Sequence, residues 1–189
     1  MRKLSVFNSV SLDGYFTGEG GDLAWAYKGS DDPEWVAFTT GNASGATGPL
    51  ILGRKTYEMM VSYWPTEAAK EAYPAAAEGM NRTEKIVFSR TLKDAKWSNA
   101  RVVRSDPAAE IRRLKAETGP DMIILGSGTI VALLAGAGLI DSFQLVVCPV
   151  VLGKGRTMFE GIAGFDLRLT GKPRSFRNSK VVLTYERAA

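Results

Sequence analysis

The chain has 189 residues, a formal net charge of +4 and 45% hydrophobic residues, which predicts one domain over residues 1–189 with a substantial core. It contains one cysteine and no histidine. This excludes an internal disulfide, Ser-His-Asp and Cys-His catalysis, and the usual zinc sites. If the protein is an enzyme, we therefore expect an organic cofactor to supply the chemistry.

The basic residues are scattered along the chain, so no block typical of a nucleic-acid-binding protein is present. No apolar run approaches the roughly 20 residues of a membrane span, and the N-terminus lacks a signal-peptide pattern. We expect a cytoplasmic protein whose partner is an anionic small molecule, not nucleic acid or a membrane. Cys148 lies in an apolar run, which predicts a buried, unreactive thiol.

The N-terminal segment predicts a strand, a loop and a helix. The strand is expected at residues 3–10, and Asp13-Gly14 predicts the turn that ends it. The irregular segment up to residue 29 holds four aromatic residues, which predict either a pocket wall or a loop pinned to the core. Residues 31–34, Asp-Asp-Pro-Glu, are typical of a helix start, and Trp35 and Phe38 would share one face of that helix.

A second strand is predicted at residues 49–52, followed at once by Gly53, Arg54, Lys55 and Thr56 at the start of a helix. Basic side chains at a helix N-terminus oppose the helix dipole, so their presence makes sense if an anion binds there. The alternative is a solvated basic pair with no ligand.

A third strand, expected at residues 84–88, ends at Ser89 and Arg90. A hydroxyl beside a guanidinium suits a phosphate, although such pairs also occur on surfaces that bind nothing. Between the second and third strands, the alanine-rich segment 66–80 predicts one or two surface helices broken at Pro74. A short strand at 101–104 and a helix at 108–118 follow.

The segment 121–134 carries the strongest signal in the chain. Residues 122–125 predict a strand buried on both faces, and the turn Gly126-Ser127-Gly128 leads into a helix that begins with Thr129 and Ile130. A strand, a glycine turn and a helix together point free backbone amides at one spot, which forms an anion site. The dinucleotide fingerprint is incomplete because Val131 replaces its third small residue, so a tight turn without a ligand stays an alternative.

The C-terminal part predicts a strand at 142–147 and an antiparallel hairpin formed by residues 166–170 and 180–186. Because strands and helices alternate before it, we expect an α/β fold with a mostly parallel sheet and an antiparallel end. Ligands of such sheets gather at the carboxyl ends of the strands. Three phosphate-suited strand ends together predict a dinucleotide, and Arg54 and Arg90 favour NADPH over NADH.

The sequence resembles a known family at several of these motifs. Residues 51–58, Ile-Leu-Gly-Arg-Lys-Thr-Tyr-Glu, resemble the cofactor-binding segment of dihydrofolate reductase, and residues 88–90 and 125–129 resemble its 2′-phosphate site and second glycine turn. Residues 11–14, 139–141 and 149–155 are more similar to the reductase domain of the riboflavin-pathway deaminase–reductase. The resemblance implies a three-layer αβα dihydrofolate-reductase-like fold, NADPH as hydride donor and a homodimer.

The substrate side departs from both relatives. Phe7 and Leu125 stand where the riboflavin-pathway domain carries a lysine and a glutamate for its substrate. Dihydrofolate reductase needs a carboxylate at its first helix, where Asp32 lies close by but also suits a helix cap. We name Asp13 and Asp32 as candidate catalytic acids, with water as the other proton source.

These observations predict an NADPH-dependent reductase that transfers hydride to a C=N or C=O group of a pterin- or aminopyrimidine-like small molecule. The first alternative is the 5-amino-6-(5-phosphoribosylamino)uracil reductase of riboflavin biosynthesis. The second is a non-catalytic NADPH-binding dimeric protein that has lost its substrate site. The residues expected to contact the cofactor are Gly53, Arg54, Lys55, Thr56, Ser89, Arg90, Gly126, Ser127, Gly128, Thr129 and Ile130.

Overall fold

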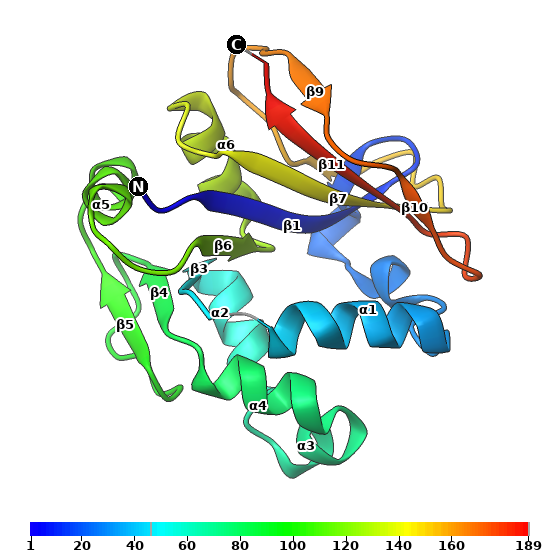
Figure 1. The fold of residues 1–189 in the computed structure, drawn as a ribbon, viewed down its shortest axis with the longest axis horizontal. Helices are drawn as coiled ribbons and strands as arrows, with labels where there is room; N and C mark the ends of the chain where they lie inside the picture. Colours follow the sequence, from blue (N-terminus) through cyan, green and yellow to red (C-terminus); the bar gives the residue numbers. More distant parts are fainter. Residues whose placement is uncertain (46, 189) are drawn as a thin grey trace.

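A nine-stranded, mostly parallel sheet forms the centre of the protein in the computed structural model, which describes residues 1–45 and 47–188 (Figure 1). Its strands are β1 (Leu4–Ser11), β3 (Leu50–Gly53), β4 (Lys85–Phe88), β5 (Ala100–Val103), β6 (Met122–Leu125), β7 (Ser142–Cys148), β9 (Leu167–Leu169), β10 (Arg174–Ser175) and β11 (Val181–Arg187). The order is β10-β11-β7-β1-β6-β3-β4-β5, and β9 also pairs with β11. All pairings from β7 to β5 are parallel, and β11 is antiparallel to its neighbours.

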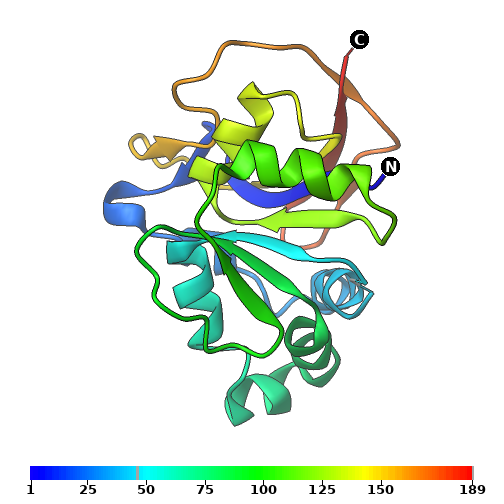
Figure 2. The same ribbon diagram turned by 90° about the vertical axis from the view of Figure 1, so that its left-hand side faces the viewer.

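Helices cover both faces of this sheet, which gives the three layers (Figures 1 and 2). They are α1 (Pro33–Ser44), α2 (Arg54–Val61), α3 (Glu67–Ala72), α4 (Pro74–Arg82), α5 (Pro107–Ala116) and α6 (Gly128–Gly136), with short 3-10 helices η1 (Glu19–Gly21) and η2 (Ala24–Tyr27). Helices α5 and α6 lie on one face, and α1, α2 and α4 lie on the other. None of the described helices combines the length and the apolar character needed to cross a membrane.

The central strands are apolar throughout because both of their faces are buried. Ile51 and Ile86 point to the cluster that includes residues of α5 and α6. Their neighbours Leu52 and Val87 point the other way, to the cluster that contains Tyr57 of α2. Successive side chains of a strand alternate between faces, so a strand between two helix layers needs an unbroken apolar run.

The aromatic residues of α1 pack against the part of the sheet that contains the antiparallel strand β11. Trp35 and Phe38 share one face of the helix, as predicted, with ring centroids 5.7 Å apart. Phe176 lies 5.1 Å from Trp35 in an edge-on contact. Cys148 is buried in the same cluster, as predicted, and burial raises the pKa of its thiol.

The predicted mixed α/β architecture and its antiparallel end are confirmed. Every strand predicted from the sequence is present, with bounds that differ by one or two residues. The sequence predicted neither strand β10 nor the two-stranded sheet in which β2 (Tyr15–Thr17) pairs antiparallel with β8 (Arg156–Thr157). Strands this short carry no alternating pattern, and the partners lie about 140 residues apart in the chain.

Candidate functional site

Three strand ends that the sequence marked as phosphate-suited lie side by side. Strand β3 runs between β6 and β4 and is parallel to both. The register places Gly53 opposite Phe88 and Ile51 opposite Ile124. The carboxyl ends of parallel strands meet at one edge of a sheet, so the segments that follow β6, β3 and β4 gather at the same edge. We call this the phosphate edge.

Ser127 ties two of these strand ends together. Its Oγ accepts a hydrogen bond from Gly53 N at 2.8 Å and donates to Leu125 O at 2.9 Å. Its own amide donates to Thr56 Oγ1 at 2.9 Å. The side chains of Ser127 and Thr56 therefore hold the starts of α2 and α6 against each other, and their contact with a cofactor stays a prediction.

Two glycines are required by the close packing of the turn before α6. Gly126 has a φ of +58°, and a Cβ placed there would lie 2.8 Å from Thr56 Cγ2. A Cβ on Gly128 would lie 2.8 Å from Phe16 Cε1. The amides of Gly128 and Thr129 have no hydrogen-bond acceptor within residues 1–45 and 47–188. They stand at the positive end of the α6 dipole, so they are available to an anion.

Ile130 is a buried part of the predicted cofactor contact at the start of α6, and its contact with a cofactor stays a prediction. Its side chain is 9% exposed and belongs to the core cluster, and its amide donates to Ser127 O at 2.8 Å. The structure therefore offers no free polar group of Ile130 to a cofactor. Ile130, the residue directly after the free amides, is turned towards the core, which the linear motif does not reveal.

A matched pair of substitutions at Ser127 tests the role of its hydroxyl and its strained backbone. Ser127 has a φ of +56° in the left-handed region. Ser127→Ala removes both hydroxyl bonds and keeps the strain, so we expect a loss of about 2 kcal/mol in the free energy of unfolding. Ser127→Gly removes the same bonds but relieves the strain, so its loss should be smaller by about 1 kcal/mol. Urea unfolding measures both, and equal losses would contradict a strained turn.

The basic residues of the phosphate edge fall into two groups. Arg54 is engaged, because its Nε pairs with Glu58 at 2.7 Å and its guanidinium donates to Thr91 Oγ1 at 2.6 Å. Lys55 and Arg90 are exposed and form no ion pair with another described residue. The Ser89 hydroxyl oxygen accepts from Leu92 N at 3.0 Å, which shapes the loop after β4. Arg54 therefore links α2 to this loop, and Lys55 and Arg90 add free positive charge nearby.

Two residues of this region were missed by the sequence reasoning. Asn8, 4% exposed, accepts from Gly126 N at 2.6 Å and donates to Gly126 O at 2.9 Å, so it clamps the glycine turn to β1. Arg156 donates to Thr129 Oγ1 at 3.1 Å and adds a guanidinium beside the start of α6. The sequence contained a hint of the role of Asn8, because an amide side chain in an apolar strand needs a hydrogen-bond partner. The sequence contained no such hint for Arg156, because β8 approaches α6 only in the folded chain.

A cavity of about 640 Å³ opens beside the phosphate edge. We call it the central cavity. Its walls come from β1, β3, β6, η2, α1, α2, α4 and the loop after α2, and Gly126 belongs both to its lining and to the glycine turn. A volume of this size suits a small-molecule ligand. The shared glycine means that a ligand of the cavity would lie next to whatever binds the turn.

The two candidate acids lie outside this cavity. Asp13 is exposed and accepts from the amides of Leu152 at 3.1 Å and Gly153 at 2.7 Å. Hydrogen bonding, first from the Ser11 side chain and then from these amides, lowers the Asp13 pKa to about 2. Asp32 caps α1, because its Oδ1 accepts from Trp35 N at 2.8 Å. Neither carboxylate lines the central cavity; Asp13 holds a loop and Asp32 caps a helix, and a catalytic role for either stays a prediction.

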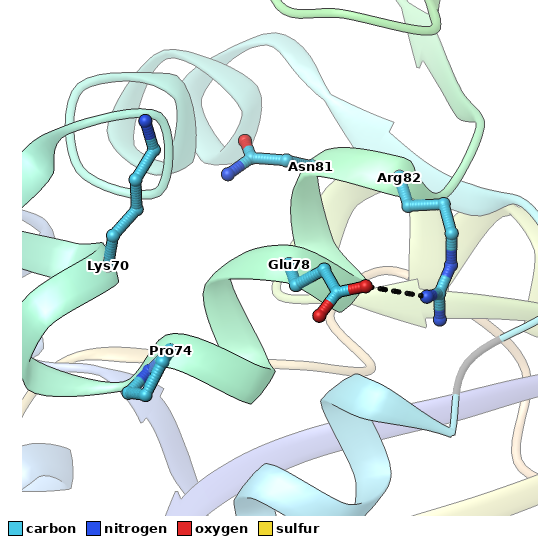
Figure 3. A pocket seen from close by; sticks show the side chains of 5 residues that line it. All are labelled: Lys70, Pro74, Glu78, Asn81 and Arg82. Atoms are coloured by element: carbon cyan, nitrogen blue, oxygen red, sulfur yellow. Dashed lines mark hydrogen bonds and ion pairs between the residues drawn. The ribbon is translucent and has the colours of Figure 1, made fainter.

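A second hollow on α3 and α4 does not offer comparable chemistry (Figure 3). Its charged side chains form ion pairs along the surface, Lys70 with Glu67 and Arg82 with Glu78. Asn81 uses its amide group internally, accepting from Trp97 Nε1 at 2.6 Å and donating to Trp64 O at 2.9 Å. The phosphate edge and the central cavity are therefore the candidate site.

Known proteins share this architecture. The chain is 25% identical to the protein YyaP of Bacillus subtilis (strain 168) over 185 residues, which cover 97% of this chain and 94% of YyaP. A solved structure from Shewanella sp. PV-4, named for riboflavin biosynthesis, has a TM-score of 0.74 at 22% identity and covers 99% of both chains. Dihydrofolate reductase from Enterococcus faecalis complexed with NADP(H) has a TM-score of 0.65 at 18% identity, covering 99% of this chain and 97% of the reductase.

These likenesses confirm the dihydrofolate-reductase-like fold that the sequence motifs implied. The family model described as the RibD C-terminal domain matches residues 2–178, nearly the whole chain. The chain therefore belongs to the RibD C-terminal domain family.

Proposed function

We propose that the protein is an NADPH-dependent reductase that transfers hydride to a C=N or C=O group of a planar small molecule such as a pterin- or aminopyrimidine-like ring. The observation that carries this proposal is the meeting of the phosphate edge and the central cavity at Gly126. One side offers amides and cations to a phosphorylated cofactor, and the other offers space for the molecule to be reduced. The family and the NADP(H)-bound reductase of the same fold support it.

The residues present fit the phosphates of such a cofactor. The free amides of Gly128 and Thr129 would hold the pyrophosphate at the start of α6. Arg54, Lys55 and Arg90 would hold the 2′-phosphate, since guanidinium and ammonium groups recognise phosphate. When bound, NADPH supplies the hydride. The chain then has to orient the acceptor and exclude bulk water, and the proton comes from water because no carboxylate lines the described cavity.

The riboflavin-pathway aminouracil reductase is the first alternative, and the cavity walls argue against it. Phe7 and Leu125 occupy the positions where the sequence comparison expected a lysine and a glutamate. They are register partners on β1 and β6, and both line the central cavity. The second alternative, a protein that binds NADPH without turnover, is separated from an enzyme by assaying NADPH oxidation with a panel of imines, quinones, dihydrofolate and the aminouracil.

The double substitution Arg54→Ala with Arg90→Ala tests the assignment of the cofactor. NADPH and NADH differ only in the 2′-phosphate, so we expect NADPH affinity to fall by about 10- to 100-fold and NADH affinity to change by less than about 3-fold. Titration calorimetry with both nucleotides measures this.

Arg112→Ala is the matched control, because Arg112 is an exposed arginine on α5, away from the phosphate edge. It should leave both affinities unchanged. An equal loss for the two nucleotides in the double variant would contradict the 2′-phosphate assignment. No heat with NADPH at millimolar concentration in the unaltered protein would rule out the reductase proposal.

A further inference from the structure

The walls of the central cavity carry no charged side chain. No Asp, Glu, Lys or Arg is found among the described residues that line it, and the chain has no histidine. A phosphate or carboxylate that enters such a cavity loses its water without gaining an opposite charge, which is strongly unfavourable. The cavity therefore selects against charged ligands.

The cavity nevertheless offers neutral hydrogen-bonding groups. Six polar side chains of its lining have no hydrogen-bond partner within residues 1–45 and 47–188. They are Tyr27, Ser30, Thr40, Asn42, Tyr63 and Tyr73. Phenol, hydroxyl and amide groups bind carbonyl, hydroxyl and ring-nitrogen atoms without a charge on either side. A ligand with a few such atoms would find partners here.

The apolar part of the lining combines aromatic rings and methionine side chains with aliphatic residues such as Leu23, Val36 and Ile123. Trp35 and Trp64 contribute indole rings, and Tyr63 packs edge-on against Trp64 with centroids 5.4 Å apart. Met59, 39% exposed, and Met60 lie beside them on α2. Aromatic faces favour flat rings, and methionine adapts to rings of different outline. The shape and chemistry of the walls therefore match a planar ring system.

Charge is present at the site, but only outside the cavity. Arg54, Lys55, Arg90 and Arg156 all belong to the phosphate edge or its surroundings, and none of them lines the cavity. The molecule thus separates a cationic surface for phosphates from a neutral chamber. A substrate that carried its own phosphate would have no cation within the chamber to bind it.

We infer that the central cavity binds an uncharged, planar aromatic or heteroaromatic compound that bears a C=O or C=N group and has no phosphate or carboxylate. The reduction of this compound rests on the proposed function, whereas its binding to the cavity does not. In that reaction the carbon accepts a hydride from NADPH, which becomes NADP⁺. The oxygen or nitrogen takes one proton from water, so the product gains two hydrogen atoms.

A matched pair of probes tests the inference without the cofactor. 1,4-Naphthoquinone and its 2-sulfonate share the same rings and carbonyls and differ in one sulfonate group, which carries a negative charge. Titration calorimetry of each compound into the protein alone should show that the neutral quinone binds at least about 10-fold more tightly. Tighter or equal binding of the sulfonate, or no binding of either at about 1 mM, overturns the inference.

A pair of variants shows whether charge is the cause. Thr40 is half-buried on the α1 wall, and its hydroxyl has no described partner. Thr40→Lys places a cation in the cavity and should raise sulfonate affinity by about 10-fold while lowering that of the quinone. Thr40→Met has a similar length and no charge, so it should leave the preference for the neutral compound in place. A sulfonate gain in both variants, or in neither, overturns the inference.

Turnover separates this inference from the proposed function. If the neutral quinone binds as expected and NADPH is not oxidised by it or by any compound of the panel, the reductase proposal fails and the binding inference stands. If NADPH oxidation is fastest with phosphorylated aminouracil or with dihydrofolate, the reductase proposal stands and the inference is overturned.

Discussion

Gly126→Ala is expected to destabilise the protein by about 3 kcal/mol and to abolish measurable NADPH binding. The new methyl group would lie 2.8 Å from Thr56 Cγ2 and 2.9 Å from Thr56 Oγ1. Thr56 Oγ1 accepts from the Ser127 amide, so Thr56 cannot move without breaking the contact that joins α2 to α6. The positive φ of Gly126 adds backbone strain for any residue with a Cβ.

Gly171→Ala is the matched control for this prediction. Gly171 also has a positive φ, of +74°, but a Cβ there meets no atom within 4 Å. Backbone strain alone should therefore lower the free energy of unfolding of this variant, by about 1 kcal/mol, and the variant should bind NADPH normally. Urea unfolding and titration calorimetry measure both variants. If Gly126→Ala is no less stable than Gly171→Ala, the close packing of the turn is not what requires glycine.

The second large effect is expected for Asn8→Leu, with a loss of about 3 kcal/mol in the free energy of unfolding. Leucine has a similar volume and would leave the N–H and C=O of Gly126 without the partners that Asn8 provides. Asn8 is 4% exposed, so the leucine would place an apolar side chain against both polar groups of Gly126. A loosened glycine turn would also misplace the start of α6, and NADPH affinity should fall with stability.

Asn42→Leu makes the same chemical change at an amide that forms no hydrogen bond within the described fold. Asn42 is exposed on α1 and has no hydrogen-bond partner in the described chain. Its replacement should change the free energy of unfolding by less than about 0.5 kcal/mol. Circular dichroism during urea unfolding follows both variants. Similar stabilities for Asn8→Leu and Asn42→Leu would show that the clamp on Gly126 contributes nothing.

The predicted cofactor residues illustrate how far a local motif predicts a site. Gly126 and Gly128 were singled out from the linear pattern, and the structure explains each of them by a close approach of Thr56 or Phe16. The same pattern included Ile130, whose side chain is in the core. A motif fixes the order of residues along the turn, whereas the packing of α6 against the sheet decides which of them stay accessible.

The candidate acids Asp13 and Asp32 show what a local sequence pattern does not predict. Asp13 and Asp32 were chosen because carboxylates near a predicted site are suitable proton donors. Asp32 accepts a hydrogen bond from Trp35 N within the helix that it caps, and Asp13 accepts one from Leu152 N in a distant loop. Neither carboxylate lines the central cavity. A carboxylate at a helix start looks the same in sequence whether it caps the helix or contacts a substrate, so only the position of the cavity distinguishes the two.

The sequence by itself determined the alternation of strands and helices, the glycine turn after β6, the basic start of α2 and the absence of histidine. The absence of histidine is a matter of composition, and the other features depend on residues within about ten positions of one another, where periodicity and turn chemistry act. The tertiary structure decided which strand ends are neighbours, that Asn8 holds Gly126, and that the central cavity has no charged lining. Each of these depends on strand order and on contacts between residues that are often more than 100 positions apart, and no local pattern encodes such pairing.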